Sequence, residues 1–261
     1  MRRKKRVTLA IALALVAGVA HAQESVTLYG MVDAGVVYVN NVNGSSHLGS
    51  VTGPTNGSRF GLRGREDLGG GLSAIFVLEN GFDTANGKLL QGGRLFGRQA
   101  FVGLQSDDVG TLTMGRQYAL TTEIIGSFAA TSMWAWLGTH PGDFDNLNAT
   151  FRLDNSFKYQ TPVFGGLQLS ATYVPGNPSG SYNRVYALGA LYTRDGFRAG
   201  LAYNVANDPS TGVLDGKIAP GEPGYVSPSK TPQFGGYASA NSWKIFGAAV
   251  GYDFGRAKVN L

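Results

Sequence analysis

Cysteine is absent from this 261-residue chain, and histidine occurs only three times. Disulfides, thiolate metal ligands and cysteine nucleophiles are therefore excluded, and hydrogen bonds and packing must hold the fold. His47 and His140 lie in expected loops, His21 lies near the N-terminus, and no paired histidine spacing typical of zinc occurs. No Gly-x-Ser-x-Gly motif is present either. The sequence thus predicts no enzyme, no catalytic residue, no cofactor and no metal site.

The first 22 residues have the three parts of a secretory signal peptide. A basic segment, residues 2–6, precedes an apolar stretch, residues 7–19, which is too short to span a bilayer. Residues 20–22 (AHA) form an A-x-A cleavage site. We predict cleavage after Ala22, which leaves residues 23–261 as one exported domain. The alternative is a retained N-terminal anchor.

Charge is scarce, at 15% of residues, and it balances once the signal peptide is set aside. Five of the 22 basic residues and no acidic ones lie in that segment, so 17 basic and 17 acidic residues remain. The overall basic balance therefore gives no reason to expect a nucleic-acid partner. After residue 22 no apolar run approaches the roughly 18–20 residues of a membrane helix.

Apolar residues alternate with polar ones in segments of about ten residues, which is typical of β-strands. The 39 glycines and the 11% aromatic content also favour β-structure with many turns. About eleven strands are expected, at residues 26–38, 58–66, 72–82, 98–104, 111–118, 155–162, 167–173, 184–193, 197–204, 243–254 and 257–261.

The expected connections alternate in length, with short turns at one end and long loops at the other. The short ones are 67–71, 107–110, 163–166, 194–196 and 255–256; the long ones are 40–57, 83–94, 119–150, 174–183 and 205–241. This layout is typical of a bacterial transmembrane β-barrel, whereas a soluble β-sandwich is the alternative. Arginines crowd one face of the strands, and aliphatic residues ending in aromatics line the other, which favours the barrel.

Four segments then resemble a known family, the general-diffusion porins of Gram-negative bacteria, of the β-proteobacterial type. They are residues 26–35 (VTLYGMVDAG), 58–72 (SRFGLRGREDLGGGL), 115–117 (GRQ) and 154–159 (DNSFKY). The resemblance covers essentially all of residues 23–261. It implies an all-β, antiparallel transmembrane barrel of the 16-stranded porin type. It also implies an outer-membrane location, contact with lipid and lipopolysaccharide, a homotrimer, and a third long loop folded into the lumen.

The chain ends at Leu261 inside an expected strand, after about eleven strands. The resemblance implies a final strand that ends in an aromatic residue. We therefore expect an N-terminal fragment of the barrel, with a smaller complete barrel as the weaker alternative. Open sheet edges are costly in hydrocarbon, so residues 23–261 alone are not expected to form a stable pore.

Arginines on the lumen-facing parity of the strands are candidates for a pore constriction, because charged side chains there set which solutes pass. By position these are Arg59, Arg63, Arg65, Arg98 and Arg116. By resemblance the basic cluster of the family matches Arg59 and Arg98, with Arg152 as its third member. The alternative is that some of these arginines only pair with wall carboxylates such as Glu66 or Glu79.

Residues 119–150 form the one long segment that neither alternates nor is a simple turn. Its apolar content predicts packing, with Trp134, Trp136 and Phe144 as anchors, and its Asp143 and Asp145 are expected to face the arginines. The predicted function is a passive pore for ions and small hydrophilic solutes, with anion preference. The alternative is an outer-membrane adhesion protein that binds through its loops, in which this loop would lie outside.

Overall fold

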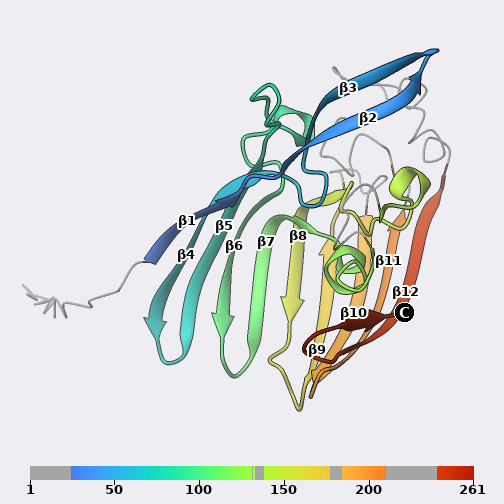
Figure 1. Cartoon of the computed structure of the whole chain (residues 1–261). Helices are drawn as coiled ribbons and strands as arrows, with labels where there is room; N and C mark the ends of the chain where they lie inside the picture. The colour runs from blue at the N-terminus through green and yellow to red at the C-terminus, as the bar shows by residue number, and fades with distance from the viewer. Residues whose placement is uncertain (1–24, 131, 133–137, 177–183, 208, 210–239) are drawn as a thin grey trace, which may run out of the picture.

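The structure, a computed structural model, describes residues 25–130, 132, 138–176, 184–207, 209 and 240–261. The predicted signal peptide and cleavage site, Trp134, Trp136 and most of the predicted loop 205–241 lie outside the described residues. Eleven described strands form one antiparallel sheet, and two more form a separate hairpin (Figure 1). None of the described helices is long and apolar enough to cross a membrane.

The main sheet follows chain order from one edge to the other. Its strands are β1 (Ser25–Met31), β4 (Arg59–Gly69), β5 (Leu72–Gly81), β6 (Gln99–Ser106), β7 (Gly110–Tyr118), β8 (Arg152–Gln160), β9 (Leu167–Val174), β10 (Arg184–Arg194), β11 (Phe197–Asn207), β12 (Ser242–Asp253) and β13 (Lys258–Asn260). The hairpin consists of β2 (Ala34–Val42) and β3 (Ser45–Thr52). The described residues also contain three short helical turns, η1 (Gln91–Gly93), η2 (Thr121–Ile125) and η4 (Pro141–Asp143).

The sheet curves into a trough whose short turns lie at one end and whose long connections lie at the other (Figure 1). The five predicted short turns each join two strands of this sheet. Within the described residues β1 and β13 are the two edges of the trough. The all-β antiparallel prediction is thus confirmed, and the described strands form an open curved sheet.

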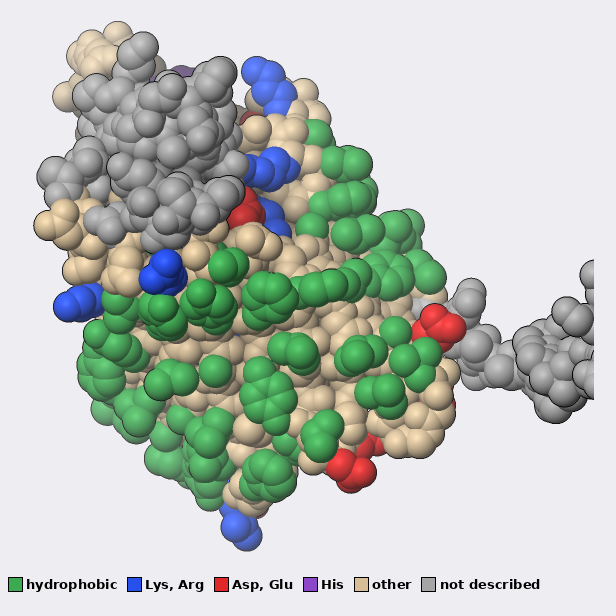
Figure 2. All heavy atoms as spheres, turned by 180° about the vertical axis from the view of Figure 1, so that it is seen from behind, with side chains coloured by type: hydrophobic (Ala, Val, Ile, Leu, Met, Phe, Trp, Pro, Cys, Tyr) green, Lys and Arg blue, Asp and Glu red, His purple; other side chains and the backbone are tan. Residues whose placement is uncertain are grey.

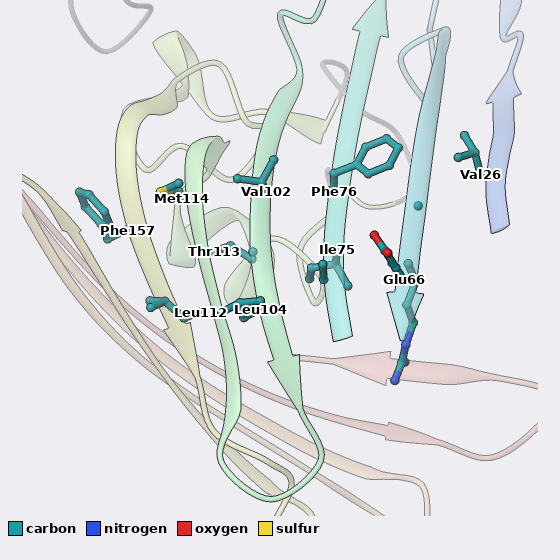
Figure 3. A pocket seen from close by; sticks show the side chains of 14 residues that line it. Val26, Glu66, Ile75, Phe76, Val102, Leu104, Leu112, Thr113, Met114 and Phe157 are labelled. Carbon is teal, nitrogen blue, oxygen red and sulfur yellow. The ribbon is translucent and has the colours of Figure 1, made fainter. Parts of the chain in front are cut away.

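The convex face of the trough is apolar because the alternation keeps one register across the strands. Phe76, Val102, Met114 and Phe157 are aligned across β5 to β8. Three of the four are more than 40% exposed. Figure 2 shows hydrophobic side chains spread over this face, with charged side chains at its margins. The aligned residues also line a shallow groove of about 630 Å³ (Figure 3). Such a surface suits contact with hydrocarbon.

One expected strand is wrong: residues 26–38 do not form a single element. The chain leaves the sheet after Met31, and β2 pairs with β3, which lies inside the expected loop 40–57. Asp33 causes the break, because its Oδ2 accepts hydrogen bonds from the Thr55 N–H and hydroxyl at 2.9 and 2.8 Å. Asn43 and Gly44, with φ of 53° and 90°, make the tight hairpin turn that an Asn-Gly pair favours.

The apolar core lies on the concave face, between the wall and the loop at residues 119–150, which joins β7 to β8. Leu120, Ile124, Ile125 and Phe128 of the loop are buried against small wall residues of β10, β11 and β12. The wall residues of this core are Ala187, Ala202 and Ala249. The loop therefore crosses the trough from β7 and rests on the strands opposite.

Candidate functional site

A pocket of about 720 Å³ lies between the inner wall and loop 119–150. Strands β4, β5, β7 and β8, the segment before β6 and the turn η2 all contribute to it. Its charged and aromatic lining residues are Arg59, Glu79, Arg98, Tyr118, Glu123 and Arg152. The three arginines that the family resemblance selected therefore meet in one place.

Glu79 on β5 holds two of these arginines. Its Oε1 accepts a hydrogen bond from Arg98 Nε at 2.7 Å, and its Oε2 lies 3.9 Å from Arg59 Nε. The hydroxyls of Tyr29 and Tyr118 donate to the same carboxylate, at 2.9 and 3.4 Å. Glu79 is only 5% exposed, so its charge is compensated in place. Arg59 and Arg98 thus pair with Glu79, and both also line the pocket.

Arg152 is held differently, by an aromatic face. Its guanidinium carbon lies 5.3 Å from the centre of the Tyr118 ring, and that of Arg98 lies 5.9 Å from the same ring. Arg152 is 5% exposed, and its Nε has no hydrogen-bond partner among the described residues. Cation–π contact with one tyrosine therefore holds two like charges close together.

A second carboxylate, Glu123 on η2, is neutralised from the wall. Lys158 on β8 donates from Nζ to Glu123 Oε1 at 2.5 Å and to the Tyr118 carbonyl at 3.0 Å. Lys158 itself is 3% exposed. Three guanidinium groups thus face two carboxylates in the pocket, and one of those carboxylates is already paired with Lys158. The pocket carries a net positive charge.

The other predicted wall arginines do not line the pocket. Arg116 is buried, donates from Nε to the Gly97 carbonyl at 2.8 Å and pairs with Asp154. Arg63 lies 5.4 Å over the Tyr29 ring and is exposed. Four residues along a strand span about 13 Å, which places Arg63 well below Arg59 along β4. Arg65, further along, donates to Ser73 Oγ at 3.1 Å.

The predicted acidic half of the constriction lies elsewhere in the loop. Asp143 is 3% exposed, and its carboxylate accepts backbone hydrogen bonds from Asn148 and Thr150 at 3.1 and 3.0 Å. Asp145 pairs with His140. Neither aspartate lines the pocket with the arginines, because both fold back on their own loop. The carboxylates that line the pocket beside the arginines are instead Glu79 on β5 and Glu123 on η2.

Comparison with known proteins now decides the family. A profile of the Gram-negative porins matches residues 8–261. This chain belongs to the Gram-negative porin family. The match extends over nearly the whole chain and agrees with the resemblance that the sequence motifs predicted.

Among the similar porins is an outer membrane porin protein of Bordetella pertussis, 43% identical over 187 residues, which cover 65% of this chain and 48% of the relative. Outer membrane porin protein 32 of Delftia acidovorans is 38% identical over 178 residues, covering 65% and 49%. The chain spans about half the length of these relatives. Membership of this family locates the protein in the outer membrane.

Solved porin structures share the fold. An anion-selective porin from Comamonas acidovorans is 26% identical, with a TM-score of 0.65 over 91% of this chain and 66% of that one. The OmpF porin of Salmonella typhi, at 19% identity, gives a TM-score of 0.61 over 90% and 64%. The second likeness shows the fold alone. Both agree with the antiparallel trough described above.

Of the three aromatic anchors predicted for this porin loop, Phe144 is the one that lies within the described residues. The Phe144 side chain is 47% exposed, and its backbone carbonyl accepts a hydrogen bond from Trp243 Nε1 at 2.9 Å. Leu120, Ile124 and Phe128 provide the packing of the described part of the loop against the wall. No pattern in the sequence singles them out, because apolar residues in a loop carry no periodicity. The ion pair of Glu123 with Lys158 is not evident in the sequence either, because the two residues are 35 positions apart in the chain.

Asp143 gives the loop of this porin a pH dependence. Burial raises the pKa of its carboxyl above the ordinary value of 3.8, and hydrogen bonds from Thr150 and Asn148 offset part of that rise. A raised folded-state pKa means that folding favours the protonated form. The stabilisation is complete below about pH 4 and is lost as pH rises through the folded-state pKa.

We therefore expect hydrogen exchange in loop 119–150 to be slower at pH 4 than at pH 7, after correction for the intrinsic rate. An Asp143→Asn variant, in which nothing titrates at this position, should lose most of that pH dependence whatever its absolute stability. An unchanged pH profile in the variant would assign the effect to another group.

Proposed function

We propose that this protein forms a water-filled outer-membrane channel for passive diffusion of ions and small hydrophilic solutes, with a preference for anions. One observation carries the proposal: Arg59, Arg98 and Arg152 converge on a single pocket between the trough wall and the inward loop. Charged side chains at a narrow aqueous gap set the selectivity of a pore. In this reading loop 119–150 is the constriction, and no catalytic chemistry is required.

The anion preference follows from the charges that remain after pairing. Glu79 is shared between Arg98 and Arg59, and Glu123 is paired with Lys158. No described carboxylate forms a salt bridge with Arg152. An anion that passes the described pocket therefore meets uncompensated positive charge. A cation meets no uncompensated negative charge there. The similar porin from Comamonas acidovorans, which is described as anion-selective, supports the same preference.

The partners that we propose follow from the surfaces. The apolar convex face (Figure 2) suits the acyl chains of outer-membrane lipid and lipopolysaccharide. Assembly as a homotrimer is proposed from family membership. The adhesion alternative requires loop 119–150 to lie outside the trough. Its buried contacts with β10 to β12 are on the inside, so that alternative is not proposed.

The test is the sign of the reversal potential across a planar bilayer. The protein, expressed from its complete reading frame, is incorporated into a neutral lipid bilayer with a tenfold KCl gradient. An anion-preferring channel shifts the reversal potential in the direction set by chloride. A shift in the direction set by potassium, or no channel activity from correctly folded protein, would contradict the proposal.

A further inference from the structure

Three glycines leave the inner wall bare beneath the turn η2. They are Gly189 on β10, Gly200 on β11 and Gly247 on β12. Gly189, Ala202 and Gly247 are aligned in one row across the three strands. None of the three glycines has a positive φ, so the backbone does not require glycine at these positions. Glycine inside a strand weakens it and marks a close approach by another part of the chain.

The loop fills the space that these glycines leave. A Cβ added at Gly189 would lie 2.4 Å from Ile124 Cδ1, and one at Gly200 would lie 2.8 Å from Ile124 Cγ2. A Cβ added at Gly247 would lie 2.7 Å from Ile125 Cγ1. Carbon atoms in contact normally sit about 3.5–4.0 Å apart. Loop and wall therefore fit together with no room for one more methyl group.

The opposite side of the same turn faces the pocket. Thr122, Glu123 and Gly126 line the pocket, whereas Ile124 and Ile125 point into the wall core. The turn is closed by a hydrogen bond from the Gly126 N–H to the Thr121 carbonyl at 2.9 Å. A short closed turn moves as one piece, so a displacement on its wall side is transmitted to its pocket side.

Two polar contacts hold the turn in place beside the glycines. Asn204 Nδ2 on β11 donates to Thr121 Oγ1 at 2.8 Å. Arg198, on the same strand, donates to Ser127 Oγ at 2.9 Å and lies 4.4 Å over the Phe128 ring. These contacts fix the loop along the wall, and the glycines fix its distance from the wall.

We infer that Gly189, Gly200 and Gly247 are positioning residues that set how far loop 119–150 projects into the pore. Their lack of side chains lets η2 sit deep in the wall, which keeps the pocket in front of Arg59 and Arg98 open. This inference rests on the proposed channel function for its effect on ion flow. The seating of the loop itself can be tested without any channel measurement.

Adding one methyl group at the wall tests the inference in the channel. Gly189→Ala should push η2 toward the arginines and lower the single-channel conductance, by on the order of 1.5-fold. Valine lacks the Cδ1 atom that would clash, so Ile124→Val in the same protein should restore most of the conductance. If Gly189→Ala only destabilised the fold, Ile124→Val would not restore the conductance.

Ala190→Val is the matched control. It adds bulk on the same strand, beside Gly189, but in a row that faces the convex side with Leu169 and Leu201. Its conductance should equal that of the unaltered protein. The inference is overturned if Gly189→Ala conducts normally, or if the double variant is no better than the single one.

A disulfide tests the seating independently of channel function. A Cβ at Gly247 would lie 3.4 Å from Ile125 Cβ, close to the Cβ separation of about 3.5–4.5 Å in disulfides. The chain has no cysteine of its own, so Gly247→Cys with Ile125→Cys introduces the only two thiols. The folded protein should oxidise to a species with no titratable thiol.

If the folded double-cysteine variant still has two free thiols after treatment with an oxidant, the inference is overturned, even if Gly189→Ala fails to fold. A disulfide that forms in a protein with no anion preference would instead refute the proposed function and leave the seating of the loop intact. The two failures are therefore distinguishable.

Discussion

Replacing Arg59, Arg98 and Arg152 together with glutamine is expected to abolish the anion preference of the channel. Two unit charges about 5 Å apart in water interact by about 0.8 kcal/mol. Each guanidinium removed should therefore lower anion occupancy of the pocket roughly fourfold at low salt, and less at high salt. With Glu79 still present, the triple variant should become non-selective or weakly cation-preferring. The measurement is the reversal potential in a KCl gradient.

Arg63→Gln is the matched control for this triple variant. Arg63 lies on the same strand as Arg59, but it is exposed and does not line the pocket. Its reversal potential should shift much less than that of Arg59→Gln. Equal shifts from the two single variants would show that the whole wall, rather than the pocket, sets the selectivity.

Removing the Glu79 carboxylate should change stability and selectivity in opposite directions. Glu79→Gln leaves the largely buried Arg98 guanidinium without its charged partner, at a cost of about 2–4 kcal/mol in unfolding free energy. The same change removes negative charge from the pocket, so the anion preference of the surviving folded channels should rise. Urea titration in detergent micelles measures the first effect, and the reversal potential measures the second.

Glu66→Gln is the control for Glu79→Gln. Glu66 is exposed on β4, and no salt bridge of it occurs within the described residues. This variant should keep both the stability and the selectivity of the unaltered protein. If Glu79→Gln behaved like Glu66→Gln, the network around Glu79 would have no energetic role.

The sequence predicts most of the wall because its pattern is local. Alternation of apolar and polar residues defines each strand, and short Gly-rich turns define which strands pair. Both rules apply residue by residue, so the eleven-stranded order of the main sheet could be derived. The break after Met31 could not, because it depends on a contact between Asp33 and Thr55 that is formed only on folding. The Asn43-Gly44 turn was nevertheless visible in the sequence.

The site was predicted in part. Alternation places Arg59 and Arg63 on the same face but says nothing of which one the loop approaches. The aspartates of the loop could not be placed, because a loop without periodicity gives no direction for its side chains. Asp143, with a φ of 49°, turns its carboxylate onto the backbone of its own loop. The pairing of Lys158 with Glu123 depends on where η2 settles on the opposite wall.

In the proposed channel the arginine pocket is the selective part of the ion path. Its most direct test changes the charge at one site in a working channel. Arg98→Cys provides the only thiol in the chain, and methanethiosulfonate reagents can attach either a sulfonate or an ammonium group there. We expect the reversal potential to move toward cation preference with the sulfonate and back toward anion preference with the ammonium. An unchanged reversal potential, in protein whose complete modification is verified by mass spectrometry, would contradict the proposed role of the pocket.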